Sequence, residues 1–166
     1  MTSDVLRREA DEDVAFEIAP HNCFACGELN RNGLQLQMHL TANGSWTEVT
    51  LDERFEGWVG IAHGGILATL ADEVMAWSLF SDEQLGLTAS LAIDFRRPAS
   101  VGRPLRAKGW ITDRRRLRYE TAARVVDLPS GAVLAEATGV YVAAPPTKAR
   151  ELRAEYGIRV ATPVAR

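Results

Sequence analysis

The stretch Gly60-Ile61-Ala62-His63-Gly64-Gly65-Ile66-Leu67-Ala68-Thr69-Leu70-Ala71-Asp72-Glu73 decides how this chain folds. Apolar residues recur there at spacings of three and four, which predicts a helix from Gly64 or Gly65 to about Phe80. The recurring residues are Ile66, Leu67, Leu70, Val74 and Trp77. The helix is largely apolar, so we expect it to be buried against other elements.

The sequence on both sides of this helix has the period of β-strands. Before it, alternating residues over 34–40 and 46–51, joined at Asn43-Gly44, predict a hairpin. After it, strands are predicted over 87–97, 103–112, 117–127 and 132–142, followed by a short helix over 148–156. One apolar helix with six half-buried strands predicts an α+β protein, an antiparallel sheet wrapped around one long central helix.

The composition is that of an ordinary globular protein. The chain has 166 residues, 46% hydrophobic and 25% charged, and a net charge of −3. We expect a charged, mobile N-terminal extension over 1–19, one domain over 20–144 and a C-terminal tail over 145–166. The mildly acidic balance argues against a nucleic-acid partner. Residues 1–13 lack the apolar core of a signal peptide and residues 61–80 are too polar to span a bilayer, so we expect a cytoplasmic protein without a membrane partner.

Two features of the helix point to chemistry. Gly64 and Gly65 open it with backbone N–H groups that no side chain covers, and such donors favour a developing oxyanion. Asp72 follows two turns later among small residues, and a carboxylate on a core-like helix is costly unless it has partners or a function. The plainer alternative is a solvated Asp72 with glycines that only permit close packing.

The motif residues resemble those of a known family. His63-Gly64-Gly65 followed by Leu70-Ala71-Asp72, together with 88–99, is similar to the signature of hotdog-fold acyl-CoA thioesterases, in the branch around phenylacetyl-CoA thioesterase. The opening Cys23-Phe24-Ala25-Cys26-Gly27, with Asn30 and Gly33-Leu34, resembles a sub-branch with a Cys-Phe-x-Cys-Gly start. The resemblance covers about residues 20–143.

The resemblance implies the hotdog fold, an acyl-CoA substrate, no cofactor, and a homodimer or a dimer of dimers. In the family, the helix Asp acts as general base or nucleophile, the Gly after the His gives the oxyanion N–H, and a Ser or Thr beginning the next strand assists. These roles fall on Asp72, Gly64 and Thr88. Thr88 has the opposite parity from Leu91, so we expect it to point away from its own helix and to reach Asp72 of a second chain.

One departure from the family pattern keeps a rival open. Many relatives carry an Asn or Gln in the loop before the His, but residues 55–60 contain no amide side chain, so either Glu56 or His63 substitutes or the site works without it. A non-catalytic acyl-CoA-binding hotdog protein is therefore the alternative. A hotdog dehydratase would need a differently spaced His and acid, which this sequence lacks.

Further residues are candidates for substrate contact. Gly65 belongs to the helix start, and Arg96 and Arg97 could hold the phosphates of coenzyme A, since arginine binds phosphate bidentately. Phe55 and Trp58 could line an acyl pocket. His63 could act as a base, although a His at a helix entrance more often orients a loop.

The two cysteines, Cys23 and Cys26, lie in a segment with the composition of a loop. With His21 and His39 they could in principle form a zinc site. Only one Cys-x-x-Cys pair exists, however, and His39 falls in a strand pattern. From the sequence we therefore expect a structural loop and no metal.

Overall fold

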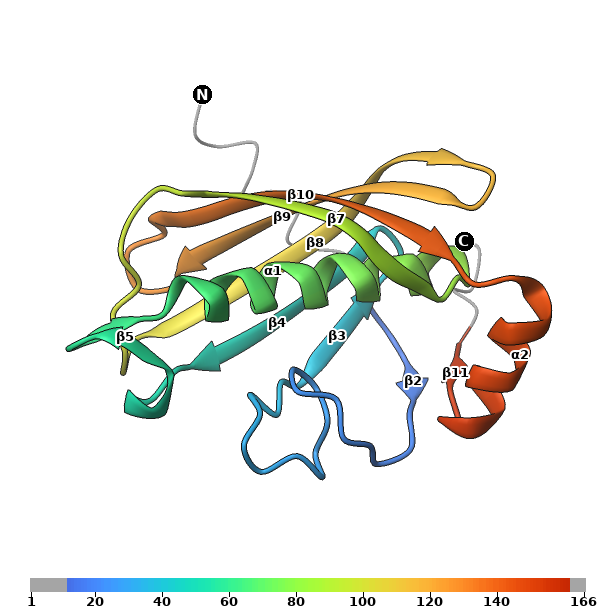
Figure 1. The fold of residues 1–166 in the computed structure, drawn as a ribbon, viewed down its shortest axis with the longest axis horizontal. Coiled ribbons are helices and arrows are strands. Elements are labelled where there is room, and N and C mark those ends of the chain that lie inside the picture. Colours follow the sequence, from blue (N-terminus) through green and yellow to red (C-terminus); the bar gives the residue numbers. More distant parts are fainter. Residues whose placement is uncertain (1–11, 162–166) are drawn as a thin grey trace.

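A curved antiparallel sheet wraps around one helix. The computed structural model describes residues 12–161. Seven strands follow the order β1-β3-β4-β8-β9-β10-β7, and α1 (Gly64–Ser78) lies across one face of the sheet (Figure 1). The predicted α+β architecture is confirmed.

The elements follow the sequence pattern closely. The strands of the main sheet are β1 (Asp13–Val14), β3 (Met38–Thr41), β4 (Gly44–Thr50), β7 (Gly86–Phe95), β8 (Pro104–Arg115), β9 (Arg118–Asp127) and β10 (Val133–Ala143). Two small sheets pair β2 (Phe16–Glu17) with β11 (Arg159–Val160), and β5 (Glu56–Trp58) with β6 (Ile61–Ala62). The other helices are the 3-10 turns η2 (Glu53–Phe55) and η3 (Leu79–Asp82), and the C-terminal α2 (Pro146–Glu155). No helix within 12–161 is long and apolar enough to cross a membrane.

The first predicted strand is the main error in the secondary structure. Only Met38–Thr41 pairs in the sheet, whereas residues 34–37 belong to a loop. Leu34 N–H donates to Phe24 O and Leu36 N–H to Ala25 O, each at 2.9 Å. Gln35 has φ +48°, which no regular strand accommodates. Leu34 and Leu36 are buried, as their alternation predicts. They pack against the helix, however, from a loop and not from a strand.

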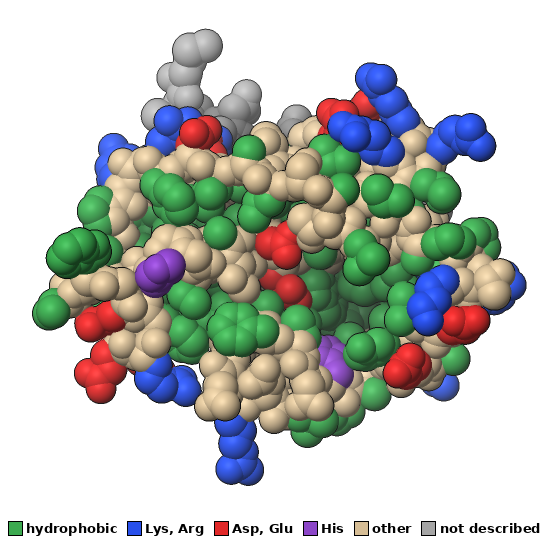
Figure 2. Space-filling model, in the orientation of Figure 1, with side chains coloured by type: hydrophobic (Ala, Val, Ile, Leu, Met, Phe, Trp, Pro, Cys, Tyr) green, Lys and Arg blue, Asp and Glu red, His purple; other side chains and the backbone are tan. Residues whose placement is uncertain are grey.

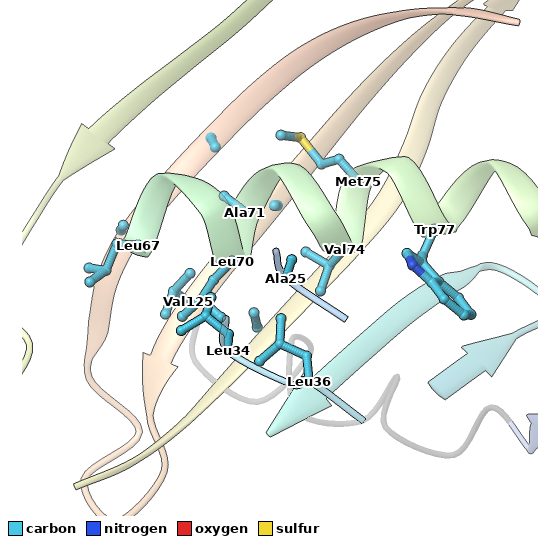
Figure 3. Packing of buried hydrophobic residues seen from close by; sticks show 14 of the residues in the cluster. Ala25, Leu34, Leu36, Leu67, Leu70, Ala71, Val74, Met75, Trp77 and Val125 are labelled. Atoms are coloured by element: carbon cyan, nitrogen blue, oxygen red, sulfur yellow. The ribbon is translucent and has the colours of Figure 1, made fainter. Parts of the chain in front are cut away.

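The helix lies unusually close to the sheet. A Cβ on Gly109 of β8 would come within 2.4 Å of the Val74 carbonyl group, so only glycine permits this crossing. Ser45 Oγ donates to the same Val74 oxygen at 2.6 Å. On the other side of α1, Leu70 and Val74 point toward the loop that carries Leu34 (Figure 3). Sheet and loop together fix the position of α1.

The described part of the predicted N-terminal extension is docked on the domain. Asp13 pairs with Thr41 in the sheet, and the Phe16 ring packs edge-on against Trp77 with centroids 4.9 Å apart. Residues 1–11 of that extension and 162–166 of the predicted tail lie outside the described residues.

Candidate functional site

Asp72 lies in the middle of α1 and is half-buried. Its Oδ1 accepts hydrogen bonds from Thr88 Oγ1 at 2.8 Å and from the Tyr141 hydroxyl at 2.7 Å. Within residues 12–161 no donor reaches Oδ2. One carboxylate oxygen is therefore held in place by two hydroxyls, and the other is open to a water molecule or a substrate.

The structure corrects the predicted direction of Thr88. Tyr141 of β10 pairs with Thr88 of β7, but the preceding Val140 pairs with Ser90, so Ala89 is an extra residue in β7. Such a β-bulge reverses the parity of the residues beyond it. Thr88 consequently faces its own helix and reaches Asp72 of its own chain, not that of a second one.

Tyr141 was not predicted from the sequence. This residue is fully buried, and its hydroxyl lies 3.0 Å from the Asp72 carbonyl oxygen as well as against Oδ1. Burial and the Asp72 carboxylate raise the pKa of Tyr141, so the phenol remains a donor. One signal was available: Tyr141 shares its parity with Gly139 and Ala143, and a tyrosine on an inward-facing parity needs a hydrogen-bond partner for its hydroxyl.

The start of α1 offers one free N–H group. His63 is the N-cap, and its Nδ1 accepts from Gly65 N–H at 2.9 Å. In the described part of the chain, the Gly64 N–H has no acceptor. His63 therefore orients the helix start, and Gly64 keeps a donor that can bind an oxyanion while the Gly65 donor is occupied.

Gly64 and Asp72 are too far apart to act on one carbonyl group within a chain. They are eight residues apart on the same helix. With a rise of 1.5 Å per residue, that separation is about 12 Å along the axis. Gly64 instead lies beside the far end of β7, since a Cβ added there would be 3.2 Å from the Phe95 ring.

The loop before the helix is closed on itself. Glu56 Oε1 accepts from Gly60 N–H at 2.8 Å, so this carboxylate supports the turn. Phe55 is buried, whereas Trp58 in β5 is 82% exposed. Of the two aromatic residues expected at an acyl pocket, Phe55 is thus part of the core and Trp58 lies on the open surface, and neither contacts Asp72 in the structure.

Arg96 and Arg97 follow directly after β7 and are exposed. Arg96 Nε lies 3.2 Å from Glu136 Oε2, and Arg97 Nη1 donates to Val133 O at 3.1 Å. In the view of Figure 2, basic side chains lie toward the edges of the face, whereas acidic side chains occur both near its middle and at its edges. A hollow of about 520 Å³ lies elsewhere, lined by Asp52, Glu53, Arg54, Glu56, Val101 and Gly102.

The cysteine loop meets the helix at Glu73. Burial and the nearby Cys23 raise the pKa of Glu73 to about 7, and Trp77 Nε1 donates to its Oε1 at 2.9 Å. A hydrogen bond from Cys26 lowers the pKa of Cys23 to about 5. His39 lies elsewhere, stacked on Trp46 and bonded to Asp13, so the structure does not assemble the two histidines and two cysteines as one set.

Comparisons with known proteins agree with this geometry. Residues 59–134 match the family model of the thioesterase superfamily. A thioesterase-superfamily protein from Bordetella bronchiseptica is 25% identical with a TM-score of 0.60, covering 66% of this chain and 84% of that one. Escherichia coli PaaI, from the phenylacetic acid degradation operon, is 19% identical with a TM-score of 0.63 over 68% and 81% of the two chains. A Streptococcus mutans protein bound to acetyl-CoA is 19% identical with a TM-score of 0.61 over 66% and 88%. No curated protein matches the chain.

The chain has the hotdog fold, and its residues 59–134 match the thioesterase superfamily. The match to the family model spans the helix start, Asp72 and Thr88. The resemblance predicted from the sequence is thus confirmed, while the sub-branch marked by Cys23 to Gly27 remains a prediction.

Proposed function

We propose that this protein hydrolyses acyl-CoA thioesters, with Asp72 as the catalytic carboxylate. The observation that carries the proposal is the Asp72 carboxylate, whose Oδ1 is held by Thr88 and Tyr141 while Oδ2 is open. A general base must be oriented and must have an oxygen free for the proton it accepts. The superfamily match and the acetyl-CoA bound to the Streptococcus mutans relative support the substrate class.

Asp72 can promote hydrolysis by two routes. As a general base, Oδ2 removes a proton from water while the water oxygen attacks the thioester carbon, and the coenzyme A thiolate leaves. As a nucleophile, Oδ2 attacks that carbon itself and the C–S bond breaks to release the coenzyme A thiolate; water then hydrolyses the acyl anhydride to the free acid and the Asp72 carboxylate. Both routes place negative charge on the thioester oxygen, for which a free backbone N–H is a suitable donor.

A second copy of the chain supplies that donor in this proposal. In the described structure β7 pairs only with β10, and its exposed residues include Leu87, Leu91 and Phe95. Such an apolar edge strand needs a partner. If two β7 strands pair antiparallel across a two-fold axis, the start of one strand lies opposite the end of the other. Thr88 of one chain, which lies beside Asp72, then approaches the end of β7 in the second chain. That end of β7 lies next to the start of α1 in the same second chain.

The remaining candidate residues fit a nucleotide at the rim of such a site. Arg96 and Arg97 are exposed at the end of β7, the same end as Gly64. Their guanidinium groups are proposed to bind coenzyme A phosphates. Trp58 is proposed to cover the acyl group or the nucleotide from the exposed loop. His63 is proposed to position the helix start rather than to act as a base, because its Nδ1 is engaged by Gly65.

Release of free thiol from a panel of acyl-CoAs, followed with a colorimetric thiol reagent, tests the proposal. The wild-type protein should turn over at least one substrate, and Asp72→Asn should lose about 10²-fold or more in kcat. Asp113→Asn, which alters a half-buried carboxylate on β8 that pairs with Arg115, is the matched control and should retain activity. An Asp72→Asn variant with wild-type turnover would refute the role of Asp72. Saturable acyl-CoA binding without any thiol release would favour the non-catalytic binding protein.

A further inference from the structure

The Cys-x-x-Cys loop brings metal-ligating groups together that the proposed hydrolysis does not use. Cys23 Sγ, Cys26 Sγ and a Glu73 carboxylate oxygen all lie within 4.8 Å of one another. His21 Nε2 lies 3.9 Å from Cys26 Sγ. These four residues, which we call the loop cluster, join residues 21–26 to α1.

The loop backbone is shaped around the two sulfur atoms. Gly27 N–H donates to Cys23 O at 3.0 Å, and a Cβ on Gly27 would lie 2.4 Å from Cys23 N. Only glycine therefore closes this tight turn. The closed turn brings the Cys23 and Cys26 sulfur atoms within 4.8 Å of each other.

The loop is also fixed against the helix, so its donor atoms are held in place. Ala25 is buried in the core between the two cysteines, and it lies near Leu34 on the same side of α1 (Figure 3). Leu36 N–H donates to Ala25 O. Buried Ala25 thus anchors the loop on α1, with Cys23 exposed on one side of it and Cys26 half-buried on the other.

We propose that Cys23, Cys26 and Glu73, with His21 as the fourth ligand, bind a zinc ion. Zinc bonds of about 2.3 Å to sulfur and 2.0–2.2 Å to nitrogen or oxygen place tetrahedral ligand atoms roughly 3.4–3.8 Å apart. The ligand atoms of Cys23, Cys26 and Glu73 need to move by only about an ångström to meet those distances, whereas the His21 ring, which is near Cys26 but not within 4.8 Å of all three, must turn further toward the site. Coordination through His21 Nε2 puts its proton on Nδ1 and breaks a long hydrogen bond of 3.4 Å from Cys23 N–H.

The Glu73 carboxylate favours a metal over a redox-active cysteine pair. A disulfide between Cys23 and Cys26 needs no third group, whereas the half-buried Glu73 carboxylate lies beside both sulfur atoms. Two cysteine sulfur atoms and a carboxylate oxygen grouped in one place are ligand types that zinc binds. Asp72, the residue before Glu73, faces Thr88 and Tyr141 instead. The zinc ion therefore has a structural role, because it fastens the loop to the central helix.

Elemental analysis of the full-length protein, purified under reducing conditions, tests this proposal. We expect one zinc per chain in the wild type and in His39→Ala, which alters a histidine outside the loop cluster. Cys23→Ser, Cys26→Ser and Glu73→Gln should each lose or weaken zinc binding. Zinc retained by the double cysteine variant would overturn the assignment.

A second measurement does not depend on the folding of any variant. Metal-stripped wild-type protein titrated with Co²⁺ should develop a thiolate-to-cobalt charge-transfer band and the d–d bands of tetrahedral Co²⁺. Zinc should displace the cobalt and raise Tm by more than about 5 °C. Absence of these bands, or formation of a Cys23–Cys26 disulfide with no metal bound at any stage, would overturn the proposal. Neither readout relies on hydrolysis, so the zinc site and the proposed function fail independently.

Discussion

The proposed two-chain site makes a specific prediction about which pairs of inactive variants restore activity together. Gly64→Pro removes the free N–H at the helix start with little other change. Proline is favoured at the first position of a helix, and His63 before it already has φ −63° and ψ 135°, the conformation that a following proline requires. Gly64→Ala is the control, because it introduces the same Cβ beside Phe95 and keeps the N–H.

The expected magnitudes follow from the geometry. An oxyanion donor must lie 2.7–3.1 Å from the oxygen, and removing one costs about 10²–10³-fold in kcat. Because Gly64 and Asp72 of one chain are about 12 Å apart along α1, their defects belong to different sites of a dimer. A heterodimer of Asp72→Ala and Gly64→Pro chains then has one intact site and one doubly defective site, and should recover about half of the wild-type activity.

Heterodimers purified through two different tags and assayed by thiol release provide the test. The Asp72→Ala and Thr88→Ala pair is the second control, since both residues contact each other within one chain. That heterodimer has one site of each parent type, so its activity should be about the mean of the two parents and should not exceed that of the more active one. No recovery with Gly64→Pro, or recovery with Thr88→Ala, would refute the two-chain site, and so would a monomer by light scattering.

Three further predictions concern single residues. Tyr141→Phe should lower kcat about tenfold, equivalent to ~1.4 kcal/mol, because Asp72 loses one of the two hydroxyl donors that orient it. Steady-state kinetics of the variant and the wild type measure this difference in kcat. Gly109→Ala should lower the free energy of unfolding in urea by about 1–3 kcal/mol, because the added Cβ meets the backbone of α1. Thr112→Ala on the same strand is the control and should change the stability little. Equal urea midpoints for the two variants would contradict the close approach of helix and sheet. Hydrogen bonds from the Arg103 guanidinium, and to a smaller extent from Ser130, hold the pKa of Asp127 well below its usual range. These bonds therefore stabilise the folded protein at any pH above the pKa that Asp127 has in the unfolded chain, and this stabilisation is lost as the pH falls toward the lower pKa of the folded state. The difference in Tm between wild type and Asp127→Asn should therefore shrink from pH 7 toward pH 2, and a constant difference would contradict this account.

Local periodicity was sufficient for the central helix and for the four long strands that follow it. The spacing of Leu70, Val74 and Trp77 predicts α1, and alternation predicts the four strands after it, because both patterns reflect which side of a regular backbone is buried. The prediction from alternation was wrong at residues 34–37. Alternation shows that Leu34 and Leu36 are buried but not that a strand buries them, since an ordered loop can do the same.

The sequence by itself determined the candidate catalytic carboxylate and the helix start, since Asp72 and Gly64 lie in one short motif. Tertiary structure decided their partners. The bulge at Ala89 turns Thr88 toward Asp72, and Tyr141 joins them from a strand 69 residues away. Glu73 meets Cys23 and Cys26 only because the N-terminal loop packs on α1. A bulge shifts parity without a change in local composition, and contacts between distant segments depend on packing, which residue spacing does not encode.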